Sequence, residues 1–139
     1  MSQPTNLLFI HARPGQTVVE RGGLAPWRVK RVAAYIEANM DSNFRAPDLA
    51  AIVRLSAGQF VRAFKKSFGE TPRVYVTRER MRHAQVMMVH SREPLSRIAV
   101  DCGMCDQAHF TRTFRKVVGI NPGVWRREFP RGASLTTRA

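Results

Sequence analysis

The sequence has few cysteines and no long apolar run, and each shortage excludes a class of protein. Two cysteines in 139 residues cannot build a disulfide framework, which indicates a cytosolic protein with reduced thiols. No apolar run approaches the ~20 residues of a membrane span, and the run at residues 7–10 is too short for a signal-peptide core. We therefore expect a cytosolic protein without a membrane segment.

Patterns typical of enzymes are also missing. The four histidines and ten acidic residues are scattered, and neither a Ser/His/Asp arrangement nor a phosphate-binding loop is present. We therefore expect no catalytic site and no cofactor. Strand-like alternation of apolar and polar residues is nearly absent too, which predicts an all-α domain.

Basic residues dominate the charge. The 23 basic side chains against 10 acidic ones give a net charge of +13, and only four of the 23 are lysines. The arginine side chain presents a planar set of donors that suits phosphates and guanine edges. Nucleic acid is therefore the favoured partner, ahead of an anionic membrane surface.

Proline and glycine divide the chain. They are frequent in residues 1–25, which we interpret as an N-terminal tail or linker with room for one short strand at residues 7–10. Residues 26–129 form the predicted domain, and residues 130–139 a C-terminal tail. Residues 27–129 carry 10 of the 13 net positive charges, so most of the basic character belongs to the domain.

Helix-start signals recur along the predicted domain. Ser56 and Gln59 fit a capping box, and the glycines at 69 and 119 fit helix ends. Proline or an N-cap residue marks each start, and the seven expected helices open at Pro26, Pro47, Ser56, Pro72, Pro94, Asp106 and Asn121.

The longest expected helix opens at Pro72 and runs to about residue 90. Val74, Met81, Ala84 and Met88 recur along it near a helical period. This spacing predicts that these four side chains face the core.

An internal repeat appears at a shift of 50 residues. The recurring pairs are Phe60 and Phe110, Arg62 and Arg112, Phe64 and Phe114, Lys66 and Lys116, Gly69 and Gly119, and Pro72 and Pro122. Before the turn of each unit the shift is 49, since Leu49 and Ala50 match Ile98 and Ala99, so the second turn carries one extra residue. A short helix, a tight turn and a basic second helix are typical of a helix-turn-helix unit.

Two such units predict a reader of double-stranded DNA. The second helix of a unit can lie in the major groove with its N-terminal residues at base edges. The helix between the units, residues 72–90, is about 28 Å long, close to the ~34 Å between successive major grooves on one DNA face. We therefore expect one chain to read two adjacent grooves as a monomer.

Residues 24–129 resemble the DNA-binding domain of the AraC/XylS family. The resemblance is carried by residues 106–115 (DQAHFTRTFR) and 119–127 (GINPGVWRR), and residues 23–27 (GLAPW) are similar to the start of that domain. It implies a seven-helix, sequence-specific transcription regulator of the bacterial cytoplasm, with helix-turn-helix units at 47–68 and 95–118 joined by the helix at 72–90. It also implies RNA polymerase as a further partner. The ligand-sensing domain of many relatives is not expected in this chain.

The resemblance places base contacts on the second helix of each unit. They are Gly58, Val61 and Arg62 in the first unit and Gln107, Ala108, Thr111 and Arg112 in the second. Arg112 is the best candidate, because arginine bonded twice to guanine is the commonest specific contact. The first set has strong donors only at Arg62, so we expect the second unit to carry more of the base reading. The candidate phosphate contacts, which position the protein without specifying a sequence, are Lys65, Lys66, Arg115 and Lys116.

Arg54 departs from the family pattern, because the first turn usually has glycine there. One expectation is an arginine in the left-handed region at a cost of ~1 kcal/mol. The other is a reshaped turn.

Cys102, Cys105 and His109 form the main alternative site. A Cys-x-x-Cys pair occurs in zinc and redox centres. No fourth ligand is near in sequence, however, and Cys102 matches Val53, an expected core position, in the repeat. We therefore expect no metal here.

Two alternative functions stay open. One is sequence-tolerant, architectural binding to nucleic acid through charge alone, which predicts a steep salt dependence and little specificity. The other is a module that contacts RNA polymerase, with DNA as a secondary partner. The sequence does not identify the operator, the sign of regulation or an effector.

Overall fold

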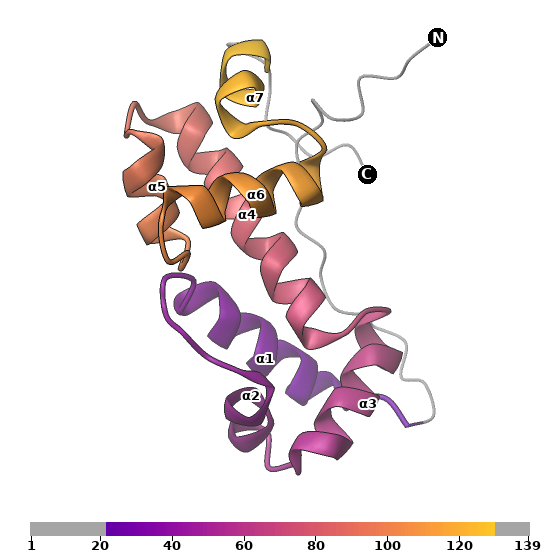
Figure 1. The fold of residues 1–139 in the computed structure, drawn as a ribbon. Helices are drawn as coiled ribbons and strands as arrows, with labels where there is room; N and C mark the ends of the chain where they lie inside the picture. The colour runs from indigo at the N-terminus through magenta and orange to yellow at the C-terminus, as the bar shows by residue number, and fades with distance from the viewer. Residues whose placement is uncertain (1–21, 130–139) are drawn as a thin grey trace, which may run out of the picture. The chain divides into compact units, whose positions relative to one another are not determined.

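This computed structural model describes residues 22–129, which contain seven α-helices joined by short turns and loops (Figure 1). They are α1 (Pro26–Ala38), α2 (Ala46–Ile52), α3 (Ala57–Phe68), α4 (Pro72–His90), α5 (Leu95–Asp101), α6 (Gln107–Val118) and α7 (Pro122–Glu128). The expected all-α fold of seven helices is confirmed. The short strand expected at residues 7–10 lies outside the described residues.

Local capping chemistry sets the boundaries of α3 and α6. The Ser56 hydroxyl accepts from the Gln59 N–H (3.2 Å) while the Gln59 side chain accepts from the Ser56 N–H (3.1 Å), which confirms the capping box. Asp106 caps α6 by accepting from the His109 N–H (2.8 Å). Gly69 ends α3 at φ 81°, in the left-handed region that glycine enters without strain.

The start of α2 differs by one residue from the expectation, since the helix begins at Ala46 rather than at Pro47. The Arg45 N–H donates to the Asp48 carboxylate (2.8 Å), so Arg45 is the N-cap. Pro47 is therefore the second helical residue, where its missing N–H leaves no helical hydrogen bond unmade.

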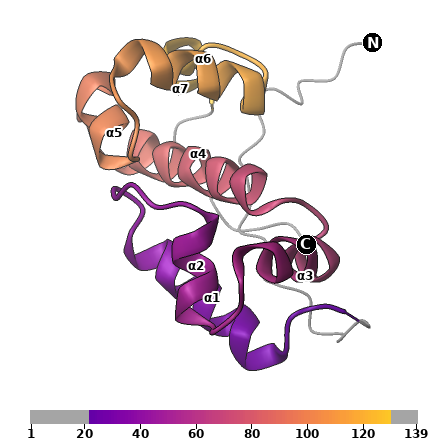
Figure 2. The same cartoon turned by 60° about the horizontal axis from the view of Figure 1, so that its bottom comes forward.

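The chain divides into two compact units between Thr77 and Arg78. The first unit contains α1, α2, α3 and the start of α4, and the second contains the rest of α4 with α5, α6 and α7. In the first unit α2 packs against α1 and α3, and in the second α6 packs against α5 and α7. Figure 2 shows the same helices from another side.

Each unit has its own hydrophobic core. The aromatic side chains at its centre are Phe60, Phe64, Phe68 and Tyr75 in the first unit and Phe110, Phe114 and Trp125 in the second. The phenylalanines that match in the repeat are buried in both units. The same four-residue spacing therefore turns the same face of α3 and α6 inward.

Val74 does not face the core as its spacing predicts, since 51% of its surface is exposed. Its neighbours Tyr75 and Val76 are buried in the first core instead, whereas Met81 and Met88 enter the second core as expected. Because α4 presents one face to the first core and another to the second, one apolar period extended along the whole helix puts Val74 on the wrong side.

The two turns confirm the extra residue. Residues 53–56 separate α2 from α3, whereas residues 102–106 separate α5 from α6. The main-chain hydrogen bonds that close the turns join matching residues, from the Leu55 N–H to the Ala50 carbonyl (3.0 Å) and from the Met104 N–H to the Ala99 carbonyl (2.9 Å). Cys105 is therefore the inserted residue.

Arg54 occupies the left-handed region at φ 59°, and Gly103 does so at the matching position with φ 78°. A side chain in this region costs about 1 kcal/mol, because Cβ approaches the following carbonyl oxygen. Since the Leu55 hydrogen bond that closes the turn is intact, the first of the two expectations is confirmed: the turn keeps its shape and Arg54 bears the strain.

No helix within residues 22–129 combines the length and the apolar character that crossing a membrane requires.

Candidate nucleic-acid interface

The outer face of α3 is basic, and the helix contains no acidic residue. Gly58, Val61, Arg62 and Lys65 lie three or four residues apart and therefore share a face. Gly58, Arg62 and Lys65 are exposed, whereas Val61 is half-buried against the first core. This face lies opposite the buried side of the helix, so Arg62 and Lys65 are available to a ligand in solvent.

Arg62 lies back along α3 over Gly58. A Cβ at position 58 would lie 3.4 Å from the Arg62 Nη1 atom. Helical side chains lean towards the N-terminus of their helix, and the guanidinium thereby reaches the N-terminal half of α3. This is the part of a recognition helix that meets base edges.

The same arrangement recurs on α6, which also contains no acidic residue. Ala108, Thr111, Arg112 and Arg115 share its outer face. Gln107, Ala108, Arg112 and Arg115 are exposed, and Thr111 is half-buried. The structure thus gathers the expected base contacts of each unit on a single helix.

Cations at the ends of the two helices have a second physical explanation. The last turns of α3 and α6 carry the four expected phosphate contacts, all exposed: Lys65, Lys66, Arg115 and Lys116. Cations in this place interact favourably with the helix dipole, by about 0.3–1 kcal/mol each. Arg62 and Arg112 lie in mid-helix, where the dipole offers no such reason. Their recurrence is therefore the stronger indication of an anionic ligand.

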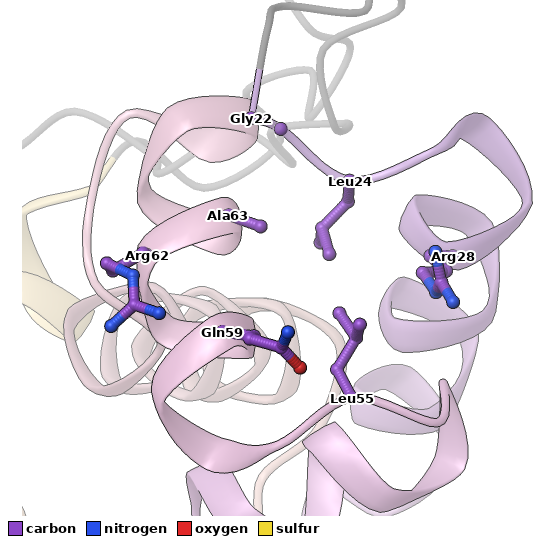
Figure 3. Close-up of a pocket in the computed structure, with 8 residues that line it drawn as sticks. Gly22, Leu24, Arg28, Leu55, Gln59, Arg62 and Ala63 are labelled. Carbon is purple, nitrogen blue, oxygen red and sulfur yellow. The ribbon is translucent and has the colours of Figure 1, made fainter.

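A cavity of about 290 Å³ lies beside α3 in the first unit (Figure 3). Leu24, Leu55 and Ala63 project towards its centre, and Arg28 and Arg62 stand on opposite sides of it. The other lining residues are Gly22, Gly23 and Gln59. Arg62 therefore borders both this cavity and the outer face of α3.

Leu24 contacts the flank of α3 through Ser67, a pairing that the sequence did not predict. The Leu24 N–H donates to the Ser67 hydroxyl (2.7 Å), and both residues are buried. The available signal was a serine on the inner face of α3, where the repeat has Val117 in α6. A buried hydroxyl on an apolar face predicts a polar partner, but nothing local identifies that partner.

The two cysteines differ in environment. Cys102 is buried in the second core and Cys105 is exposed. Burial and the negative charge of Asp101 raise the pKa of the Cys102 thiol to about 12, against a smaller opposing effect of Arg80. The thiol is therefore protonated at neutral pH, whereas metal ligands and nucleophiles are thiolates. Cys102 is a core residue, as its match to the buried Val53 predicts.

We expect only Cys105 to react rapidly with an aromatic disulfide reagent in the folded protein. Cys102 should react after unfolding, because its thiol is buried and protonated. Titration near pH ~8, below the pKa of an ordinary thiol, should release one equivalent per chain in buffer and two in denaturant. Two rapidly reacting thiols in buffer would contradict the burial of Cys102.

The raised pKa of Cys102 also predicts that the stability of the folded protein falls as the pH rises from 9.0 towards 12, since the thiol of the unfolded chain ionises first.

Both turns and both basic helices lie within the residues that a single protein-family model matches. A family model described as a helix-turn-helix domain matches residues 49–128, which is more than half of the chain. The chain belongs to the AraC-type helix-turn-helix family. The resemblance expected from the sequence is thereby confirmed, and the matched residues extend from α2 to α7.

Relatives of this AraC-type chain match it at moderate sequence identity, and two of them are solved structures. The probable transcriptional regulator LumQ of Photobacterium leiognathi is 33% identical over 88 residues, 63% of this chain and 36% of LumQ. The C-terminal domain of AraT, a response regulator from Geobacillus stearothermophilus, matches with a TM-score of 0.72 at 24% identity, over 84% of this chain and 95% of that one. The DNA-binding domain of AdpA, solved with a target DNA, matches with 0.69 at 24%, over 72% and 90%. The chain spans 36% to 44% of the length of the first curated relatives.

Proposed function

We propose that this AraC-type chain reads the sequence of double-stranded DNA with α3 and α6, each in a major groove, and thereby regulates transcription. The observation that carries the proposal is the acid-free outer face of each helix with an arginine at the matching position, Arg62 or Arg112. LumQ, a probable transcriptional regulator, and the AdpA domain, solved with its target DNA, support it. One chain binds as a monomer and covers two adjacent grooves.

The two helices differ in how much sequence they can read. On α6, Gln107, Thr111 and Arg112 all carry hydrogen-bonding groups for base edges. On α3, Arg62 is accompanied by Gly58, which has no side chain, and by Val61, which is half-buried and offers only methyl groups. We therefore expect the stricter sequence preference in the half of the site that α6 contacts.

Selection of bound sequences from random duplex DNA tests the proposal. We expect two blocks of preferred base pairs about one helical turn (~10.5 bp) apart, because both recognition helices must face the same side of the duplex. Inserting half a turn between the blocks should sharply weaken binding. A selection without preference, combined with a steep salt dependence, would favour charge-driven architectural binding and overturn the proposal.

Arg112→Ala should weaken binding to the selected sequence by about 1–3 kcal/mol and relax the preference at one base pair, because a bidentate contact to guanine is lost. Competition binding at fixed salt measures both effects. The control is Arg127→Ala, which removes the same charge from an exposed position on α7 of the same unit. Equal weakening of Arg112→Ala on selected and scrambled DNA would contradict a base-reading role.

A further inference from the structure

Residues 22–24, here called the strap, pass from the flank of α3 towards the start of α1 and line the cavity beside α3 (Figure 3). The Leu24 side chain is 2% exposed, and its N–H donates to the Ser67 hydroxyl over 2.7 Å. Gly22 has φ +82°, and a Cβ there would lie 3.3 Å from the Lys66 Cδ atom. The strap is thus joined to α3 by a buried hydrogen bond, by an apolar side chain and by a lysine stem that lies over its glycine.

These contacts are not needed to complete the helix. α3 is capped by Ser56 at its start and ends at Gly69. Ser67 lies on the inner face, at the position where α6 has Val117. The hydroxyl is therefore a feature of the first unit, and it serves the backbone of the strap rather than α3 itself.

The strap and α3 both line the cavity. Leu24 reaches it from the strap and Ala63 reaches it from α3, and both side chains belong to the buried core of the first unit. On this flank, the Leu24 side chain and the Ser67 hydrogen bond join α3 to the strap. Arg62 borders the same cavity, so a small rotation of α3 about its axis displaces its guanidinium.

We propose that the strap positions the first recognition helix, and that Leu24 and Ser67 are positioning residues for base reading by Arg62. The proposal rests on the function proposed above. Neither residue touches DNA; both fix the rotation of α3, on which the aim of Arg62 depends.

The test compares the full chain with Ser67→Ala, which removes the acceptor, and Leu24→Ala, which removes the apolar contact. Ser67→Thr keeps the hydroxyl and should rescue the first variant. Val117→Ala is the matched control at the same position of α6. Binding is measured on the selected DNA and on versions scrambled in one half only, the halves being assigned with Arg62→Ala and Arg112→Ala.

For Ser67→Ala and Leu24→Ala we expect a loss of about tenfold in discrimination at the α3 half, the size of one good base contact. Discrimination at the α6 half should stay within about twofold. Leu24 and Ser67 belong to the first compact unit and α6 to the second, and distant sites without shared partners behave independently. A role in stability alone would reduce binding to both halves together, and that result would overturn the proposal. Unchanged discrimination at both halves would overturn it as well.

A measurement without DNA separates this proposal from the proposed function. In Ser67→Ala, amide resonances of α3 should shift and the Leu24 amide should exchange faster with solvent, while amides of α6 stay unchanged. If the wild-type chain showed no sequence preference, the proposed function would fail, and these spectra would decide whether the strap still sets the orientation of α3. Unchanged amide signals in α3 would refute the proposal that the strap positions this helix.

Discussion

Phe64→Ala should lower the free energy of unfolding of the first unit by about 4 kcal/mol, the range seen when a buried phenylalanine is cut to alanine. Phe64 is fully buried at the centre of a ring cluster. Its ring stacks on Phe68 at 4.0 Å between centroids and meets Phe60 and Tyr75 at 5.5 Å each. Because a whole domain is stable by only about 5–15 kcal/mol, this variant should leave the first unit close to unfolding.

Phe114→Ala is the matched comparison in the second unit. Phe114 is also fully buried, but its ring neighbours, Phe110 and Trp125, lie at 5.7 and 6.0 Å without stacking. We expect its loss to be smaller by about 1 kcal/mol, the value of one or two aromatic contacts. Hydrogen exchange of the amides of each unit, with denaturant titrations, measures the two effects separately. A larger loss from Phe114→Ala would contradict the importance of the stacked ring.

The second large effect is expected at Arg126, which links α7 to the end of α4. Its Nε donates to the Met88 carbonyl (3.3 Å), Nη1 to the Glu93 carbonyl (2.7 Å) and Nη2 to the Ser91 carbonyl (2.8 Å). Met88 is in the last turn of α4, where carbonyls lack helical partners and a positive charge is favourable. One side chain thus satisfies three backbone acceptors in succession.

Arg126→Met should lower the stability of the second unit by about 3 kcal/mol, since hydrogen bonds from a charged donor contribute about 1.5–3 kcal/mol each and water compensates part of the loss. Arg126→Lys should rescue little, because an ammonium lacks the planar fork. Arg127→Met, at the adjacent exposed position, is the control and should change stability by less than about 0.5 kcal/mol. Equal stabilities of Arg126→Met and Arg127→Met in thermal and urea unfolding would show that the three contacts contribute nothing.

Local chemistry made much of the fold predictable. Ser56 and Asp106 carry N-cap side chains, and Gly69 allows a left-handed helix end, so each signal acts within a few residues of its effect. The 50-residue repeat extended these signals to a second copy and gave the extra residue in the second turn. Helix order and the inner faces of α3 and α6 follow from such patterns alone.

Contacts between distant segments were not predictable in the same way. Leu24 and Ser67 are 43 residues apart, and Arg126 bonds carbonyls 33 to 38 residues away. Neither pairing leaves a periodic trace, because each depends on which backbone groups the folded chain brings together. The prediction that Val74 is buried was wrong for a related reason, since α4 presents one face to the first core and another face to the second.

The candidate site also combines features that the sequence predicts with features that only the structure shows. Exposure of Arg62 and Arg112 follows from the helical period, and the structure confirms it. The position of the Arg62 guanidinium over Gly58 depends on the space that glycine leaves, and it was not expected. Which base pairs these arginines contact is a property of the complex and stays a prediction.

Cys105, the residue inserted in the second turn, has a practical consequence. It is exposed, it directly precedes the Asp106 cap of α6, and Cys102 is sealed in the core. A spin label or fluorophore attached through sulfur should therefore modify Cys105 alone, directly before α6, the helix proposed to read the major groove, without any mutation. A label on Cys105 can therefore report the distance between the start of α6 and a label placed on the DNA.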